Sequence, residues 1–164
     1  MSAGFLLDTS ALSLLAPGKP VPPAAFAAWL RQHNDQLYVS AITVAEIEQG
    51  ICKLKRAGST ARANDLSHWL ESILSLEESR ILPFDARVGR IAGALSDLAV
   101  AKGRHPGFAD VAIAATAKAH NLVLLSCNGK HFEPLGVECV DPVDSLSDRG
   151  HWGNKYRVSS TKQL

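Results

Sequence analysis

Short apolar segments alternate along this chain with stretches of helical periodicity, and this alternation constrains its fold more than any other feature. Five segments are short and apolar enough to be buried strands, at residues 4–8, 36–40, 81–84, 122–125 and 137–140. Between them, apolar side chains recur every three or four residues, as at Val44, Ile47, Ile51 and Leu54. Strands that alternate with helices indicate an α/β domain with a mainly parallel sheet.

The length and composition favour one folded unit. The chain has 164 residues, which suits a single domain. We expect this domain to span residues 1–144, because from about Ser145 the chain turns polar and loses periodicity. Residues 145–164 are therefore predicted to be a C-terminal tail. There is no internal repeat and no linker between domains.

Charge and cysteine content limit the possible environments and partners. Seventeen basic against sixteen acidic residues leave a net charge of +1, so any nucleic-acid binding must come from local patches. Three cysteines without a CxxC pair argue against a disulfide framework or a zinc knuckle and favour a reducing cytoplasm. No apolar run approaches the roughly 20 residues needed to cross a bilayer. We expect a soluble cytoplasmic protein with no membrane partner.

Four side chains that can bind a cation follow the predicted strands. Asp8 ends the first strand, and Glu46 lies near the start of the helix after the second. Asp110 lies in the first turn of the helix that precedes residues 122–125, and Asn128 follows that strand. Because sites in parallel α/β sheets form at the carboxyl ends of the strands, these residues are predicted to share one cleft.

Three carboxylates in one cleft would repel each other. At 4 Å each pair costs about 1–4 kcal/mol, depending on the effective dielectric constant. A divalent cation relieves this repulsion, and Mg²⁺ or Mn²⁺ accepts such oxygen ligands together with water. An alternative explains each acid alone, since acids are favoured as helix caps and in first turns. Glu46 fits it best, because Thr43 and Glu46 have the spacing of a capping box.

A family resemblance favours the metal interpretation. Residues 5–12, 40–51 and 108–117 resemble, in order and spacing, three signature blocks of the PIN-domain family, and residues 122–132 resemble the fourth. The set is most similar to VapC-type toxins. The resemblance implies a three-layer α/β/α sandwich around a mainly parallel sheet and an endoribonuclease that depends on Mg²⁺ or Mn²⁺. It also implies a homodimer, an RNA substrate and inhibition by a small cognate antitoxin.

The resemblance also assigns roles to individual residues. By position, Asp8, Glu46 and Asp110 match the family's three metal-binding acids. Ser10 matches a small polar residue beside the site, and Asn128 matches a fourth position that is Asp or Asn in relatives. The chain departs from many relatives in two places. It reads Ser126-Cys127-Asn128 where they read Thr-Arg-Asn, and Glu48 stands where an arginine is common.

Basic residues close to Asp110 are candidates for RNA contact. Lys102, Arg104 and His105 precede it by a few residues and could bind phosphates beside the cleft. The six histidines form no HxxxH or HExxH pattern, which favours surface or capping roles over zinc binding. Cys127 adjoins the predicted site, but with no assignable histidine base it is interpreted as a small filler rather than a nucleophile.

Other functional classes fit the residues less well. A receiver-type phosphoacceptor domain would need paired acids at the first strand, where Ala3-Gly4-Phe5 has none, although Lys130 could serve as its lysine. An aspartyl-phosphate phosphatase would need an Asp at the position of Ser10. A PIN-like domain that binds RNA or a protein without cutting stays open, because metal ligands alone do not prove turnover.

Overall fold

A parallel sheet forms the centre of the molecule. The computed structural model describes residues 4–75 and 78–147. The strands are β1 (Phe5–Leu7), β2 (Leu37–Ser40), β3 (Ile81–Leu82), β4 (Val123–Leu125) and β5 (Cys139–Val140). They pair in the order β3-β2-β1-β4-β5, and every neighbouring pair is parallel. The first strand of the chain is therefore the middle strand of the sheet.

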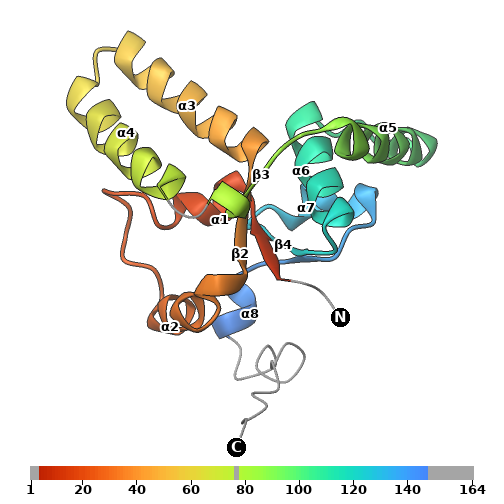
Figure 1. Cartoon of the computed structure of the whole chain (residues 1–164), viewed down its shortest axis with the longest axis horizontal. Coiled ribbons are helices and arrows are strands. Elements are labelled where there is room, and N and C mark those ends of the chain that lie inside the picture. The colour runs from red at the N-terminus through yellow and green to blue at the C-terminus, as the bar shows by residue number, and fades with distance from the viewer. Residues whose placement is uncertain (1–3, 76–77, 148–164) are drawn as a thin grey trace, which may run out of the picture.

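Helices cover both faces of this sheet (Figure 1). The α-helices are α1 (Thr9–Ser13), α2 (Ala24–Gln32), α3 (Ala41–Arg56), α4 (Thr60–Leu74), α5 (Ala86–Ala101), α6 (Phe108–Ala119), α7 (Gly129–Phe132) and α8 (Asp144–Ser147). Short 3₁₀ helices are η1 (Asn34–Gln36), η2 (Glu78–Arg80) and η3 (Glu133–Leu135). In Figure 1, α3 and α4 form a hairpin that projects away from α5 and α6.

The side-chain alternation of β1 explains the three layers. Leu6 belongs to a core cluster with side chains of α5 and α6, whereas Phe5 and Leu7 belong to a second cluster with side chains of α1–α4. Successive residues of a strand point to opposite faces, so a fully apolar strand must be covered on both sides. The predicted α/β/α sandwich around a parallel sheet is confirmed.

Several predicted boundaries agree with the structure, and others shift. Asp85 caps α5 as predicted, since its side chain accepts a hydrogen bond from the Val88 N–H at 2.9 Å. The helix expected from Pro22 begins later, because Pro23 is the N-cap of α2 and not part of its first turn. The last strand contains only Cys139 and Val140 of the predicted residues 137–140.

The capping box expected at Thr43 and Glu46 was wrong. Helix α3 begins three residues earlier than predicted, at Ala41, and Ser40 is its N-cap. The Ser40 hydroxyl accepts a hydrogen bond from the Ile42 N–H at 3.1 Å. Thr43 is buried inside the first turn, and Glu46 lies in the second turn, where no free backbone N–H needs a cap. The capping explanation for Glu46 is therefore removed.

The beginning of the predicted C-terminal tail is partly helical. Helix α8 (Asp144–Ser147) includes its first residues and contacts α2. The rest of the predicted tail, residues 148–164, lies outside the described residues. Among the described helices, none combines the length and the apolar character needed to cross a membrane.

Two glycines should respond in opposite ways to an added methyl group. Gly4, just before β1, has a φ of +152°, and a Cβ there would lie 2.5 Å from the Gln36 carbonyl oxygen. Gly4→Ala should lower the free energy of unfolding by about 1–3 kcal/mol through backbone strain and overlap.

A Cβ at Gly93 in α5 would meet no heavy atom within 4 Å beyond the backbone of its own helix. Gly93→Ala should raise stability by about 0.5–1 kcal/mol, as alanine favours helix. Urea unfolding would measure both, and equal effects would contradict the explanation.

Candidate active site

Asp8 is held at the end of β1 by both its backbone and its side chain. Its N–H donates to the Leu125 carbonyl oxygen at 3.0 Å, which continues the pairing of β1 with β4 by one residue. Its Oδ1 accepts from the Ala11 N–H at 2.8 Å, so Asp8 is the N-cap of α1. This five-residue helix was not predicted. Asp8 is only 5% exposed, and its position is therefore fixed by the sheet and by the helix that it caps.

Two serines complete the surroundings of the Asp8 carboxylate. The Ser10 hydroxyl donates to Oδ1 at 2.7 Å, and the Ser126 hydroxyl donates to Oδ2 at 2.6 Å. Each serine also accepts a backbone N–H from the segment after β4: Ser10 from Cys127 and Ser126 from Asn128, both at 2.9 Å. Ser10 thus lies beside the site as predicted. Together the serines connect the carboxyl ends of β1 and β4.

Glu46 and Asp110 each contact a polar side chain of a neighbouring element. The Thr9 hydroxyl, in α1, donates to Glu46 Oε1 at 2.5 Å. Asp110 lies in the first turn of α6 as predicted, and its Oδ2 is 3.2 Å from Nδ1 of His131 in α7. The Asp110 side chain is 29% exposed, so it can be reached from solvent.

The three predicted acids line one pocket of about 420 Å³. The other lining residues are Thr9, Ser10, Ser13, Gly107, Ala109, Ile113, Asn128 and His131. No lysine or arginine is among the residues that line this pocket. The structure therefore brings Asp8, Glu46, Asp110, Ser10 and Asn128 together, as the order of the strands predicted.

The acids surround the pocket without already forming a coordination shell. Among the described residues, no three His, Cys, Asp or Glu side chains are grouped closely enough to hold a metal ion. Acids that line a pocket without forming a complete shell suit Mg²⁺, which usually keeps several waters and binds few carboxylates directly. Oxygen-only acidic side chains around a pocket without lysine or arginine fit a hydrated Mg²⁺ or Mn²⁺ ion.

The Asn128 side chain does not cap a helix. It occupies the N-cap position of α7, but its side chain makes no capping hydrogen bond. Its backbone carbonyl accepts the His131 N–H at 2.9 Å, and its backbone N–H donates to Ser126. The backbone therefore shapes the turn, while the side chain lines the pocket.

The three basic candidates lie outside the pocket. Lys102, Arg104 and His105 are exposed, and none of them lines it. The Lys102 ammonium donates to the Pro134 carbonyl oxygen at 3.2 Å, which connects the end of α5 to η3. Their predicted contact with RNA would therefore have to occur beyond the pocket itself.

Cys127 is next to the site but is not a reactive thiolate. Burial, and then the negative charges of Asp141 and Asp8, raise the pKa of its thiol above the usual value. Burial also raises the pKa of Cys139 to about 12. Both side chains are free thiols. Because only a thiolate is strongly nucleophilic, these pKa shifts support the interpretation of Cys127 as a filler.

Thr9, Ser126 and His131 belong to the site but were not predicted. Thr9 was missed because α1 has only five residues, too few for a periodic pattern. His131 was grouped with surface histidines. The sequence does place His131 three residues after Asn128, and the turn between them brings α7 against α6. That spacing could have indicated that His131 lies near the site.

Known proteins resemble this chain over most of its length. The PIN domain family model matches residues 5–136. The toxin FitB of Neisseria gonorrhoeae is 37% identical over 140 residues, covering 84% of this chain and 97% of that protein. The VapC ribonuclease Y4jK of Sinorhizobium fredii is 36% identical over 140 residues, covering 84% and 96%. The crystal structure of FitAcB from Neisseria gonorrhoeae superposes with a TM-score of 0.72 and 37% identity, over 84% of this chain and 97% of that one.

The chain therefore belongs to the PIN-domain family. Within it, the relatives named above are a toxin and a VapC ribonuclease, in agreement with the predicted similarity to VapC-type toxins.

Proposed function

We propose that this chain is a metal-dependent endoribonuclease and the toxin of a toxin–antitoxin pair. The observation that carries the proposal is the pocket into which three different elements bring Asp8, Glu46 and Asp110, with no lysine or arginine in its lining. Two relatives that match most of the chain support it, one named a toxin and the other a ribonuclease.

In this proposal Asp8, Glu46 and Asp110 hold Mg²⁺ or Mn²⁺. When bound, such an ion lowers the pKa of a water molecule and stabilises negative charge on a phosphoryl group. The chain's own residues then have separate tasks. Ser10 and Ser126 fix the Asp8 carboxylate, Thr9 fixes Glu46, and the Asn128 amide is free to hold a water molecule or a phosphate oxygen.

The test is cleavage of a mixed RNA pool by purified protein, with Mn²⁺ or with a chelator, followed by mapping of the new ends. We expect discrete cuts with Mn²⁺ and none with the chelator. RNA that binds to the protein but is not cut with any metal ion tested would favour the non-cleaving PIN-like alternative.

Substitution of Arg104 and His105 by alanine should weaken RNA binding without changing where the RNA is cut.

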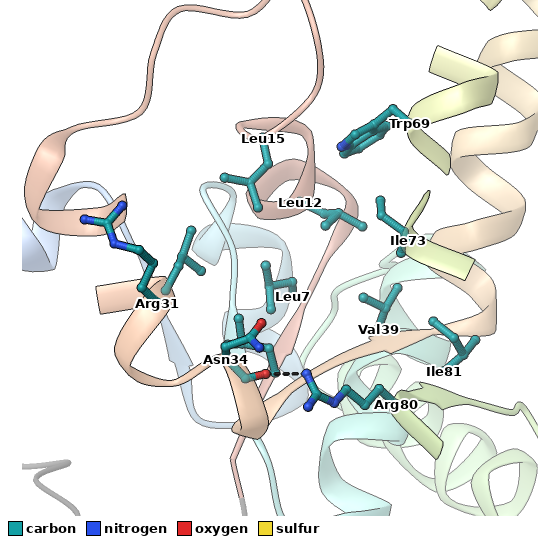
Figure 2. A pocket seen from close by; sticks show the side chains of 12 residues that line it. Leu7, Leu12, Leu15, Arg31, Asn34, Val39, Trp69, Ile73, Arg80 and Ile81 are labelled. Atoms are coloured by element: carbon teal, nitrogen blue, oxygen red, sulfur yellow. Dashed lines mark hydrogen bonds between the residues drawn. The ribbon is translucent and has the colours of Figure 1, made fainter. Parts of the chain in front are cut away.

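A protein partner is part of the proposal, and a second pocket offers a place for it. This groove of about 400 Å³ is lined by apolar side chains of α1, α2, α4, the sheet and the turn that follows α1. Figure 2 shows Leu12, Leu15 and Trp69 among them. The charged side chains that line it are Arg31 and Arg80, both basic. Such a groove fits an amphipathic segment with apolar and acidic side chains, and we propose the cognate antitoxin as its occupant.

Expression of this chain alone should arrest growth, and coexpression with a small adjacent reading frame should restore it.

Leu15→Arg and Arg31→Glu should each weaken the affinity for the antitoxin by about 10-fold or more, since the first places a charge in the groove and the second reverses one. Arg90→Glu on α5 is the charge-matched control, because Arg90 is exposed and does not line the groove. Affinity measured by calorimetry decides this, and a complex equally tolerant of all three changes would contradict docking in the groove.

We further propose a homodimer, as the family resemblance implies and as is commonest among oligomers. Light scattering tests this directly. A monomeric mass at concentrations that give full cleavage would show that the dimer is not needed.

A further inference from the structure

All three acids of the pocket share one feature: each has an oxygen close to a polar side chain from another element or from a neighbouring residue. Asp8 accepts hydrogen bonds from Ser10 and Ser126, and Glu46 accepts one from Thr9. Asp110 Oδ2 lies 3.2 Å from Nδ1 of His131. The first two sets use hydroxyl groups. The third uses an imidazole ring, which is also part of the pocket lining.

The contact between His131 and Asp110 joins two well-anchored backbones. Asp110 is followed in α6 by Val111, Ala112 and Ile113, all of which are buried. His131 is followed by Phe132, which is 1% exposed and belongs to the same core cluster as Val111 and Ile113. Helices α6 and α7 pack against each other. The core therefore fixes the two backbones, from which the side chains of His131 (60% exposed) and Asp110 (29% exposed) meet with Nδ1 3.2 Å from Oδ2.

We propose that His131 is a positioning residue that holds Asp110 for the divalent ion. Because a carboxylate oxygen only accepts, Nδ1 in this proposal directs its N–H at Oδ2 and leaves Oδ1, for which the described residues show no hydrogen bond, to the ion. Fixing the carboxylate in this way removes the cost of ordering it when the ion binds. Side chains that hold a metal ligand from outside the coordination shell commonly contribute about 10–100-fold to metal affinity. The inference rests on the proposed function, since it concerns the same pocket.

The geometry of the contact defines a discriminating set of variants. His131→Ala removes the donor. His131→Asn places an amide N–H close to the position of Nδ1, whereas His131→Gln places one close to the position of Nε2. Lys130→Ala is the matched control, because Lys130 is exposed on the same short helix and does not line the pocket.

Calorimetric titration of each RNA-free protein with Mn²⁺ is the first measurement. His131→Ala should raise the dissociation constant by about 10-fold, which is the lower end of the range for such partners. His131→Gln should behave in the same way, His131→Asn should recover most of the affinity, and Lys130→Ala should match the wild type. Cleavage followed against Mn²⁺ concentration should show the same shifts in midpoint, with saturating rates that stay within about 3-fold of the wild type.

Three results would overturn this inference. An unchanged dissociation constant with a raised KM for RNA would mean that His131 contacts the substrate. A lowered dissociation constant in His131→Ala would mean that His131 competes with the ion. An equal loss of Mn²⁺ affinity in His131→Asn and His131→Gln would show that the contact through Nδ1 does not position Asp110. Failure of the proposed function itself is recognised separately, because then the wild-type protein would neither bind Mn²⁺ nor cut RNA.

Discussion

Asp8→Asn, Glu46→Gln and Asp110→Asn should each reduce RNA cleavage by about 100-fold or more. Loss of a mere hydrogen-bond partner of a metal ligand already costs about 10–100-fold, so loss of a ligand charge should cost at least the upper end of that range. The three side chains come from three different elements and meet only in the pocket. Equal loss at all three would therefore indicate one shared site. Initial rates on a defined RNA at saturating Mn²⁺ measure the effect.

Matched controls are available for these substitutions. Glu48 lies two residues beyond Glu46 in α3 and is exposed, and Asp97 is an exposed acid of α5. Neither lines the pocket, so Glu48→Gln and Asp97→Asn should retain wild-type rates. Wild-type cleavage by any of the three pocket variants would remove that residue from the proposed site.

Asp8→Ala should lower the free energy of unfolding by about 2–4 kcal/mol. The estimate combines the loss of a helix N-cap, about 0.5–2 kcal/mol, with the loss of an acceptor for the buried Ser126 hydroxyl and the half-buried Ser10 hydroxyl. Asp8 is the one acid of the three that is buried, and it accepts from Ala11, Ser10 and Ser126. Urea unfolding in the absence of metal would measure this change.

Asp110→Ala is the comparison for this prediction. Asp110 is partly exposed, and its one polar side-chain contact among the described residues is with His131. Its removal also relieves repulsion in the pocket. Its unfolding free energy should stay within about 1 kcal/mol of the wild type. If the two alanine variants were equally stable, Asp8 would not have the structural role that its hydrogen bonds indicate.

The part of the site that was predicted from the sequence depends on strands. Strand β1 is apolar and ends on Asp8, and β4 is apolar and leads to Asn128. In a parallel sheet these ends meet at one edge, so the acids could be placed in a common cleft before any coordinates were known. Asp110 was placed for the same reason, because it opens the helix that leads into β4.

The residues that were missed depend on local turns and on packing between distant segments. Thr9 contacts Glu46 across 37 positions, and Ser126 contacts Asp8 across 118. Such pairs leave no periodic signal in the chain. The capping error had a related cause, since Ser40 and Thr43 are both favourable caps, and Ser40 lies where β2 ends. Once α3 begins at Ala41, Glu46 has no role as a cap, and the structure shows it instead with a hydrogen bond from Thr9 and a place in the pocket lining.

A crystal structure of the protein soaked with Mn²⁺ tests the central claim most directly. Anomalous difference maps locate manganese without assumptions about the ligands. The account predicts a peak inside the pocket with oxygens of Asp8, Glu46 and Asp110 among its direct or water-mediated contacts, and no such peak in Asp110→Asn at the same Mn²⁺ concentration. An empty pocket in the wild type at a concentration that supports full cleavage, or a peak elsewhere in the molecule that Asp110→Asn leaves unchanged, would contradict it.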